Sequence, residues 1–168
     1  MPAKTQKKST FKLTYATMFN PPEELHSRYD AQLVKTRAAL GQEYGMIIDG
    51  KEVKAAEKIE HRSPINQDWL LARFQKGNAD DARAALAAAR KAFPKWSHMP
   101  WRERVRLMRK AADLIDKRIY EFGVVMSLEV GKNRMEALGD AAESADLIRY
   151  ACDQMEANKG YLVRMGKD

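Results

Sequence analysis

The residue types that most often carry chemistry are sparse in this sequence. It holds one cysteine, Cys152, and three histidines, His26, His61 and His98. The histidines lie 35 and 37 residues apart, far outside the spacing of metal-binding motifs, and a single thiol forms neither a zinc-thiolate cluster nor an internal disulfide. We therefore expect no catalytic residue and no metal site in this chain.

The one thiol has the sequence environment of a packing residue. Cys152 falls on an apolar helical stripe with Ala145, Ile148 and Met155. Catalytic cysteines need accessible, electropositive surroundings that keep a thiolate ready to react. We expect Cys152 to be buried and to react slowly with thiol reagents.

Three acidic side chains, Glu136, Asp140 and Glu143, recur at positions i, i+4 and i+7 of a predicted helix. Such a row is typical of the solvated face of a surface helix. A carboxylate in the row could also bind the ammonium group of a small molecule through a charge-assisted hydrogen bond. The residues alone leave both interpretations open. No Gly-rich phosphate-binding loop occurs in the sequence, so it predicts no cofactor-binding residue.

The composition indicates a globular protein outside the membrane. Of 168 residues, 45% are hydrophobic and 32% are charged, which is enough to bury a sizeable core. No apolar run approaches the roughly 18 residues of a membrane helix, and the first residues lack the apolar region of a secretory signal. We expect a cytoplasmic location.

The net charge of +7 raises the question of nucleic acid. Lysine and arginine are interleaved with acidic residues along the chain, and no nucleic-acid-binding motif accompanies them. The charge leaves open a stand-alone basic helical interaction module that binds an acidic partner or nucleic acid. Steeply salt-dependent retention on a polyanion column would support such a module.

The first half of the chain predicts an arm, one helix and short strands. Residues 1–20 lack periodicity, and a loosely amphipathic helix follows, with Gly41 as its expected C-cap. Asp49-Gly50 lies between two β-favouring runs at 46–53, which is a strong hairpin signal because both residues accept positive φ. Two further strands are expected at 57–63 and 69–76.

The second half predicts helices. Asn78 is a good N-cap for a helix over 79–96, which we expect Pro94 to end. Apolar periodicity predicts helices over 101–122 and 135–158, with a short segment between them that stops at Gly131. The expected organisation is an amino-terminal arm and helix at 1–44, a β-hairpin and strand region at 45–78, a helical part at 79–160 and a lead into a further strand at 161–168.

This order of elements closely resembles the amino-terminal part of the aldehyde dehydrogenase superfamily. The resemblance runs over residues 45–160: the hairpin, the turn Ser63-Pro64-Ile65-Asn66, the helices that follow, and the element Glu129-Val130-Gly131-Lys132 with Glu136-Ala137. It implies an α/β fold of which this chain is the mostly helical amino-terminal part, with a small β-hairpin region and without most of the cofactor-binding sheet. Residues 161–168 would then be the truncated lead into an oligomerisation strand.

Within the superfamily the sequence is most similar to the 1-pyrroline-5-carboxylate dehydrogenases, which oxidise L-glutamate γ-semialdehyde to glutamate in proline catabolism. The similarity lies in residues 11–20, in residues 40–44 before the hairpin, and in the helix motif at 141–150. In that branch the helix glutamate borders the substrate pocket, and it falls on Glu143, although Ser144 and Ala145 replace bulkier apolar residues usual there.

The resemblance also implies what this segment lacks. The family's catalytic cysteine, its glutamate base and its dinucleotide-binding loops lie downstream of the matched stretch. The parent enzyme would use NAD or NADP, act on a small aldehyde and form a homo-oligomer. The 168-residue chain alone would bind no cofactor, would be inactive, and would have the remainder of the enzyme as its partner.

Overall fold

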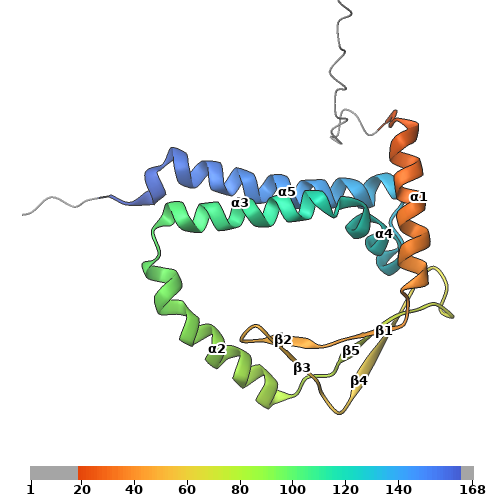
Figure 1. The fold of residues 1–168 in the computed structure, drawn as a ribbon, viewed down its shortest axis with the longest axis horizontal. Coiled ribbons are helices and arrows are strands. Elements are labelled where there is room, and N and C mark those ends of the chain that lie inside the picture. Colours follow the sequence, from red (N-terminus) through yellow and green to blue (C-terminus); the bar gives the residue numbers. More distant parts are fainter. Residues whose placement is uncertain (1–18, 164–168) are drawn as a thin grey trace, which may run out of the picture.

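The computed structural model describes residues 19–163 (Figure 1). The arm expected at 1–20 lies almost entirely outside the described residues, as do most of residues 161–168. The helices are α1 Glu23–Ala38, α2 Ala79–His98, α3 Trp101–Lys117, α4 Ile119–Val130 and α5 Arg134–Ala157, with a 3-10 turn, η1, at Lys159–Tyr161. The strands are β1 Gln42–Tyr44, β2 Met46–Ile48, β3 Lys51–Val53, β4 Lys58–Arg62 and β5 Leu70–Gln75.

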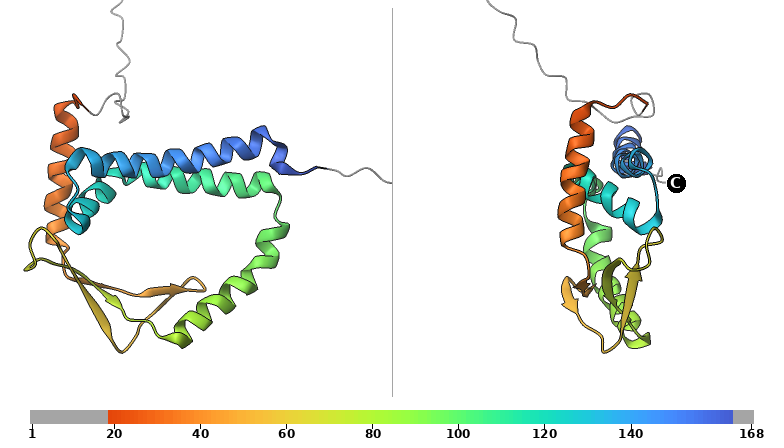
Figure 2. Two further views of the ribbon diagram at one scale, coloured as in Figure 1. Left: turned by 180° about the vertical axis from the view of Figure 1, so that it is seen from behind. Right: turned by 90° about the vertical axis from the view of Figure 1, so that its right-hand side faces the viewer.

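The helices and strands form an open frame. In every view α3 and α5 lie side by side, α1 crosses them at the end where α4 packs, and α2 runs apart from the pair toward the strands (Figures 1 and 2). One sheet has the order β1-β5-β4, with β1 parallel and β4 antiparallel to β5, and β2 and β3 form a separate antiparallel pair. The predicted mostly helical segment with a small β-hairpin region is thus confirmed.

The Asp-Gly hairpin forms where the sequence predicts it. Asp49 and Gly50 have φ values of 51° and 74°, which a two-residue turn of this hand requires at both positions. Met46 pairs with Val53 and Ile48 with Lys51. Expected strands 57–63 and 69–76 are also confirmed as β4 and β5, within one residue at each end.

Two expected helix ends are wrong. The first helix ends at Ala38, and Gly41, with φ 78°, instead donates its N–H to the carbonyl of Leu71 at the start of the sheet. Pro94 lies inside α2, which continues to His98. Proline removes one helical N–H donor, and here the following turn still forms, with the Ser97 hydroxyl donating to the Pro94 carbonyl at 3.1 Å.

The expected helix 101–122 is two helices. Arg118 leaves helical geometry, with φ −110° and ψ 17°, and its side chain donates two hydrogen bonds to Glu121 in the first turn of α4, at 2.8 and 2.5 Å. The change of direction carries Val124 and Leu128 into the core, which they form with residues of α1 and α5: Leu25, Tyr29 and Leu138.

Small side chains allow α3 and α5 to pack closely. Ala112 and Ala145 are fully buried, and Val105 and Cys152 are buried beside them. Arginines bridge the two helices at the surface: Arg149 of α5 pairs with Asp113 and Asp116, and Arg109 of α3 pairs with Asp153 and Glu156. The expected helix 135–158 is confirmed as α5. Glu143 and Cys152, the two residues singled out from the sequence, both lie on this helix.

Candidate functional site

The turn between α4 and α5 is held by buried hydroxyl groups. The Tyr29 hydroxyl of α1 donates to Oγ of Ser127 at 2.6 Å, and the Ser63 hydroxyl donates to the Leu128 carbonyl at 2.5 Å. Gly131 then ends α4 with φ 74°, the left-handed cap that the sequence predicts. Segments 65 and 98 residues apart in the chain therefore fix the backbone on which the Glu129–Lys132 element sits.

The first turn of α5 is tied to α1. The side chain of Asn133 accepts from the N–H groups of Met135 and Glu136 at 3.1 and 3.0 Å. Arg134 pairs with Asp30, lies 2.9 Å from Nδ1 of His26, and stacks over the ring of Tyr29 at 4.4 Å. The sequence did not predict this clamp, because a lone arginine at a helix start carries no signal of a partner more than 100 residues away.

The acidic row of α5 faces Lys132. The Lys132 ammonium forms an ion pair with Asp140, and this hydrogen bond, with the charges of Glu136 and Glu143, holds the pKa of Lys132 above its ordinary value. Glu143 is exposed, and within residues 19–163 its carboxylate makes no hydrogen bond. Asp140 therefore pairs with the Lys132 ammonium, and the Glu143 carboxylate remains able to accept a hydrogen bond from a bound cation.

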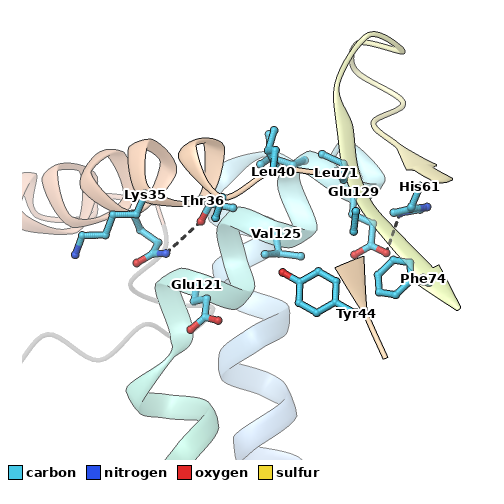
Figure 3. A pocket seen from close by; sticks show the side chains of 14 residues that line it. Lys35, Thr36, Leu40, Tyr44, His61, Leu71, Phe74, Glu121, Val125 and Glu129 are labelled. Atoms are coloured by element: carbon cyan, nitrogen blue, oxygen red, sulfur yellow. Dashed lines mark hydrogen bonds and ion pairs between the residues drawn. The ribbon is translucent and has the colours of Figure 1, made fainter. Parts of the chain in front are cut away.

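A cleft of about 330 Å³ lies on the other side of α4, between α1 and β5 (Figure 3). Leu40, Leu71 and Val125 give it apolar walls, and the acidic side chains of Glu121 and Glu129 also line it. Glu143 does not line this cleft, so the nominated substrate residue and the cleft are separate.

One wall of the cleft holds a pairing that the sequence did not reveal. Nε2 of His61 lies 3.0 Å from Oε1 of Glu129. That nitrogen is shielded from solvent and makes no hydrogen bond within the described residues, so the contact is a close approach and not an aligned bond. No local pattern links two residues 68 positions apart, and neither is brought to a cysteine.

Cys152 has the buried setting expected of a packing residue. Its side chain is 3% exposed, and Sγ lies 3.8 Å from the carbonyl oxygen of Val105 across the α3–α5 contact. Among residues 19–163, no group of histidine, cysteine and acidic side chains is arranged to hold a metal ion. None of the helices in this range combines the length and the hydropathy of a membrane-spanning segment.

The starts of helices α2 and α5 are already capped by side chains. At α2 the Asn78 side chain takes the N–H groups of Asp80 and Asp81, and Asp81 in turn accepts from the N–H of Asn78. At the start of α5 the side chain of Asn133 accepts hydrogen bonds from two backbone N–H groups, and the Glu136 carboxylate adds negative charge to the first turn. A phosphate needs free amide donors and positive surroundings, so neither start offers a cradle.

Comparison with known proteins identifies the family. The model of the aldehyde dehydrogenase family matches residues 52–168. The chain is 38% identical over 122 residues to 1-pyrroline-5-carboxylate dehydrogenase 1 of Halalkalibacterium halodurans, covering 72% of this chain and 24% of that protein. It is 35% identical over 127 residues to the 1-pyrroline-5-carboxylate dehydrogenase of a Geobacillus species, covering 76% of this chain and 25% of that protein.

Solved structures give the same grouping. A variant of Thermus thermophilus 1-pyrroline-5-carboxylate dehydrogenase superposes with a TM-score of 0.84 and 27% identity, covering 99% of this chain and 31% of that one. An NAD-dependent aldehyde dehydrogenase of Sinorhizobium meliloti is 42% identical, with a TM-score of 0.67, covering 73% of this chain and 25% of that one. The α/β fold class expected from the resemblance is thereby confirmed.

The chain spans about a quarter of the length of the curated relatives that it matches. The solved Thermus structure covers 99% of this chain, and its match therefore includes helix α1. This chain belongs to the aldehyde dehydrogenase family, and its similarity is to the amino-terminal part of the 1-pyrroline-5-carboxylate dehydrogenases.

Proposed function

We propose that this chain is the amino-terminal segment of an enzyme that oxidises L-glutamate γ-semialdehyde to glutamate in proline catabolism, with NAD or NADP as the hydride acceptor. One observation carries the choice of branch. The family-wide model begins at residue 52, and the Sinorhizobium aldehyde dehydrogenase covers only 73% of the chain. The 1-pyrroline-5-carboxylate dehydrogenase of Thermus covers 99%, which includes α1.

Glu143 would border the substrate pocket of that enzyme. An amino-acid semialdehyde carries an ammonium group, and a carboxylate complements it through a charge-assisted hydrogen bond. The Lys132–Asp140 pair supports this role, because the Lys132 ammonium hydrogen-bonds to Asp140 and leaves the carboxylate oxygens of Glu143 available to a ligand.

The remainder of the enzyme would supply the reaction chemistry. Neither the capped start of α2 nor that of α5 fits a dinucleotide, and Cys152 is buried against Val105. One solved relative, from Thermus, is described with bound NAD, and the cofactor of the present enzyme would bind to the part that follows this segment. We propose a homo-oligomeric, cytoplasmic enzyme.

Two measurements test this function. The purified 168-residue chain should form no NADH or NADPH with glutamate semialdehyde, and turnover that disappears in Cys152→Ala would overturn the assignment. In full-length protein that carries this segment, Glu143→Gln should raise KM for glutamate semialdehyde with little change for an aldehyde of similar length without an amino group. Equal effects on both substrates would remove Glu143 from the substrate pocket.

A further inference from the structure

Three aromatic rings gather at one end of the cleft between α1 and β5. Tyr44 of β1 and Phe74 of β5 are register partners, and their rings stack with 5.6 Å between centroids and 25° between planes. The ring of His61 is tilted by 60° against Phe74, at 6.1 Å. Tyr44 and Phe74 are 47% and 42% exposed, so much of this aromatic surface remains accessible.

The faces of these rings are not occupied by a cation of the chain itself. An aromatic face carries negative charge density and attracts cations. Within residues 19–163, five arginines stack over the rings of Tyr29, Trp69, Trp101, Tyr120 and Phe122. None of the five lies over Tyr44 or Phe74, and the rings at the cleft are therefore free to receive a cation from outside.

Glu129 adds a negative charge at the same end of the cleft. Its Oε1 lies 3.0 Å from Nε2 of His61 without an aligned hydrogen bond. Figure 3 shows Glu129 beside the aromatic rings, whereas Lys35 lies at the opposite end and points away from them. Glu121, the other acidic side chain of the lining, already accepts two hydrogen bonds from Arg118. Glu129 is thus the carboxylate available to a ligand at the aromatic end.

The cleft also has the size and the walls of a small-molecule site. Its volume of about 330 Å³ lies at the lower end of the range for ligand pockets, about 300–1,000 Å³. Leu40, Leu71 and Val125 offer apolar contact to the body of a ligand, while the ring faces and Glu129 offer attraction to a positive charge.

We propose that this cleft binds a small organic cation, an ammonium ion that carries an apolar or aromatic body. Glu129 repels an anion of the same shape, so the site distinguishes ligands by the sign of their charge. Glu143 does not line the cleft, and this inference is therefore independent of the proposed enzymatic function.

Equilibrium dialysis of the 168-residue chain against benzyltrimethylammonium tests the proposal, because this probe joins one aromatic ring to a permanent positive charge. Saturable binding is expected, at least about tenfold tighter than that of phenylacetate, which joins the same ring to a negative charge. Benzyl alcohol, the neutral counterpart, should fall between the two. No saturable binding of the cation, or equal binding of phenylacetate, would overturn the proposal.

Chemical modification of histidine locates the bound cation. His61 lines the cleft, whereas His98 is exposed at the end of α2 and lies outside it. Saturating benzyltrimethylammonium should slow the reaction of His61 with diethyl pyrocarbonate at least about threefold, because the bound ligand covers the ring. The rate at His98, measured in the same sample by mass spectrometry of the peptides, should not change. An unchanged rate at His61 would overturn the proposed location.

Variants test the two attractive features separately. Glu129→Gln should weaken binding of the cation at least about fivefold through loss of charge, and Tyr44→Leu about threefold through loss of a ring face. Circular dichroism should show the same helix content in both, because both side chains are substantially exposed. Glu103→Gln makes the same change of charge in the first turn of α3, outside the cleft, and should leave binding unchanged. Equal weakening by Glu103→Gln and Glu129→Gln would overturn the proposal.

Discussion

Two glycines in facing helices allow a matched test of how closely α4 and α5 pack. Gly123 lies in α4 and Gly139 in α5, both inside helices. A Cβ at position 123 would stand 2.7 Å from Cδ2, 3.2 Å from Cγ and 3.4 Å from the backbone nitrogen of Leu138. A Cβ at position 139 would meet nothing within 4 Å. The same substitution is therefore crowded at one site and free at the other.

The expected effects have opposite signs. Alanine in place of glycine inside a helix stabilises by up to about 1 kcal/mol, and this gain should appear in full for Gly139→Ala. At position 123 overpacking costs about 1–3 kcal/mol, since Leu138 is 1% exposed and has little room to move. Gly123→Ala should thus lose about 1 kcal/mol, which places the two variants about 2 kcal/mol apart.

Urea unfolding followed by circular dichroism measures both free energies of unfolding. For a chain of this size the gap corresponds to about 4–8 °C in Tm. Because α4 and α5 flank the turn that carries Lys132, the result reports directly on the geometry of the candidate site. A Gly123→Ala variant as stable as Gly139→Ala would refute the close approach of the two helices.

Further predictions concern the thiol, the caps, the acid response and association. Cys152 should react with a disulfide reagent at least about tenfold more slowly in native than in denatured protein, because it is 3% exposed. Gly131→Ala should lower the free energy of unfolding by about 1–2 kcal/mol, because φ 74° is strained for alanine. The hydrogen bonds from Arg118 hold the pKa of Glu121 below its ordinary value. The pair therefore stabilises the folded chain above the ordinary pKa of glutamate, and this stability is lost as the pH falls through the lowered pKa of the folded state. Glu121→Gln should make the free energy of unfolding less dependent on pH in that acid range. Light scattering of the isolated chain should show self-association, and a sharp monomer peak would contradict the exposed apolar surface.

Features with local causes were predictable from sequence. The Asp49-Gly50 turn, the Asn78 cap and the Gly131 cap each depend on a few adjacent residues, and each is found as expected. The burial of Cys152 followed from helical periodicity. The acidic row was recognised, but its pairing with Lys132 was not.

The features that were missed depend on distant partners. Arg118 interrupts a periodic apolar stripe because Val124 and Leu128 must reach residues of α1. Pro94 is accepted inside α2, although proline is a common helix terminator. The contact of His61 with Glu129 arises only when β4 meets α4. In each case the local sequence allows more than one structure, and contacts with residues far away in the chain select the one that forms.

The position of α1 has a consequence for how this family should be divided into parts. Residues before 52 fall outside the family-wide match, yet α1 supplies Leu25 and Tyr29 to the core and the hydroxyl that binds Ser127. A helix outside the family-wide match is thus part of the folding unit, and a version shortened to the family boundary would expose the core residues of α4 and α5 that α1 covers. The family match begins at residue 52, whereas the folding unit begins with α1.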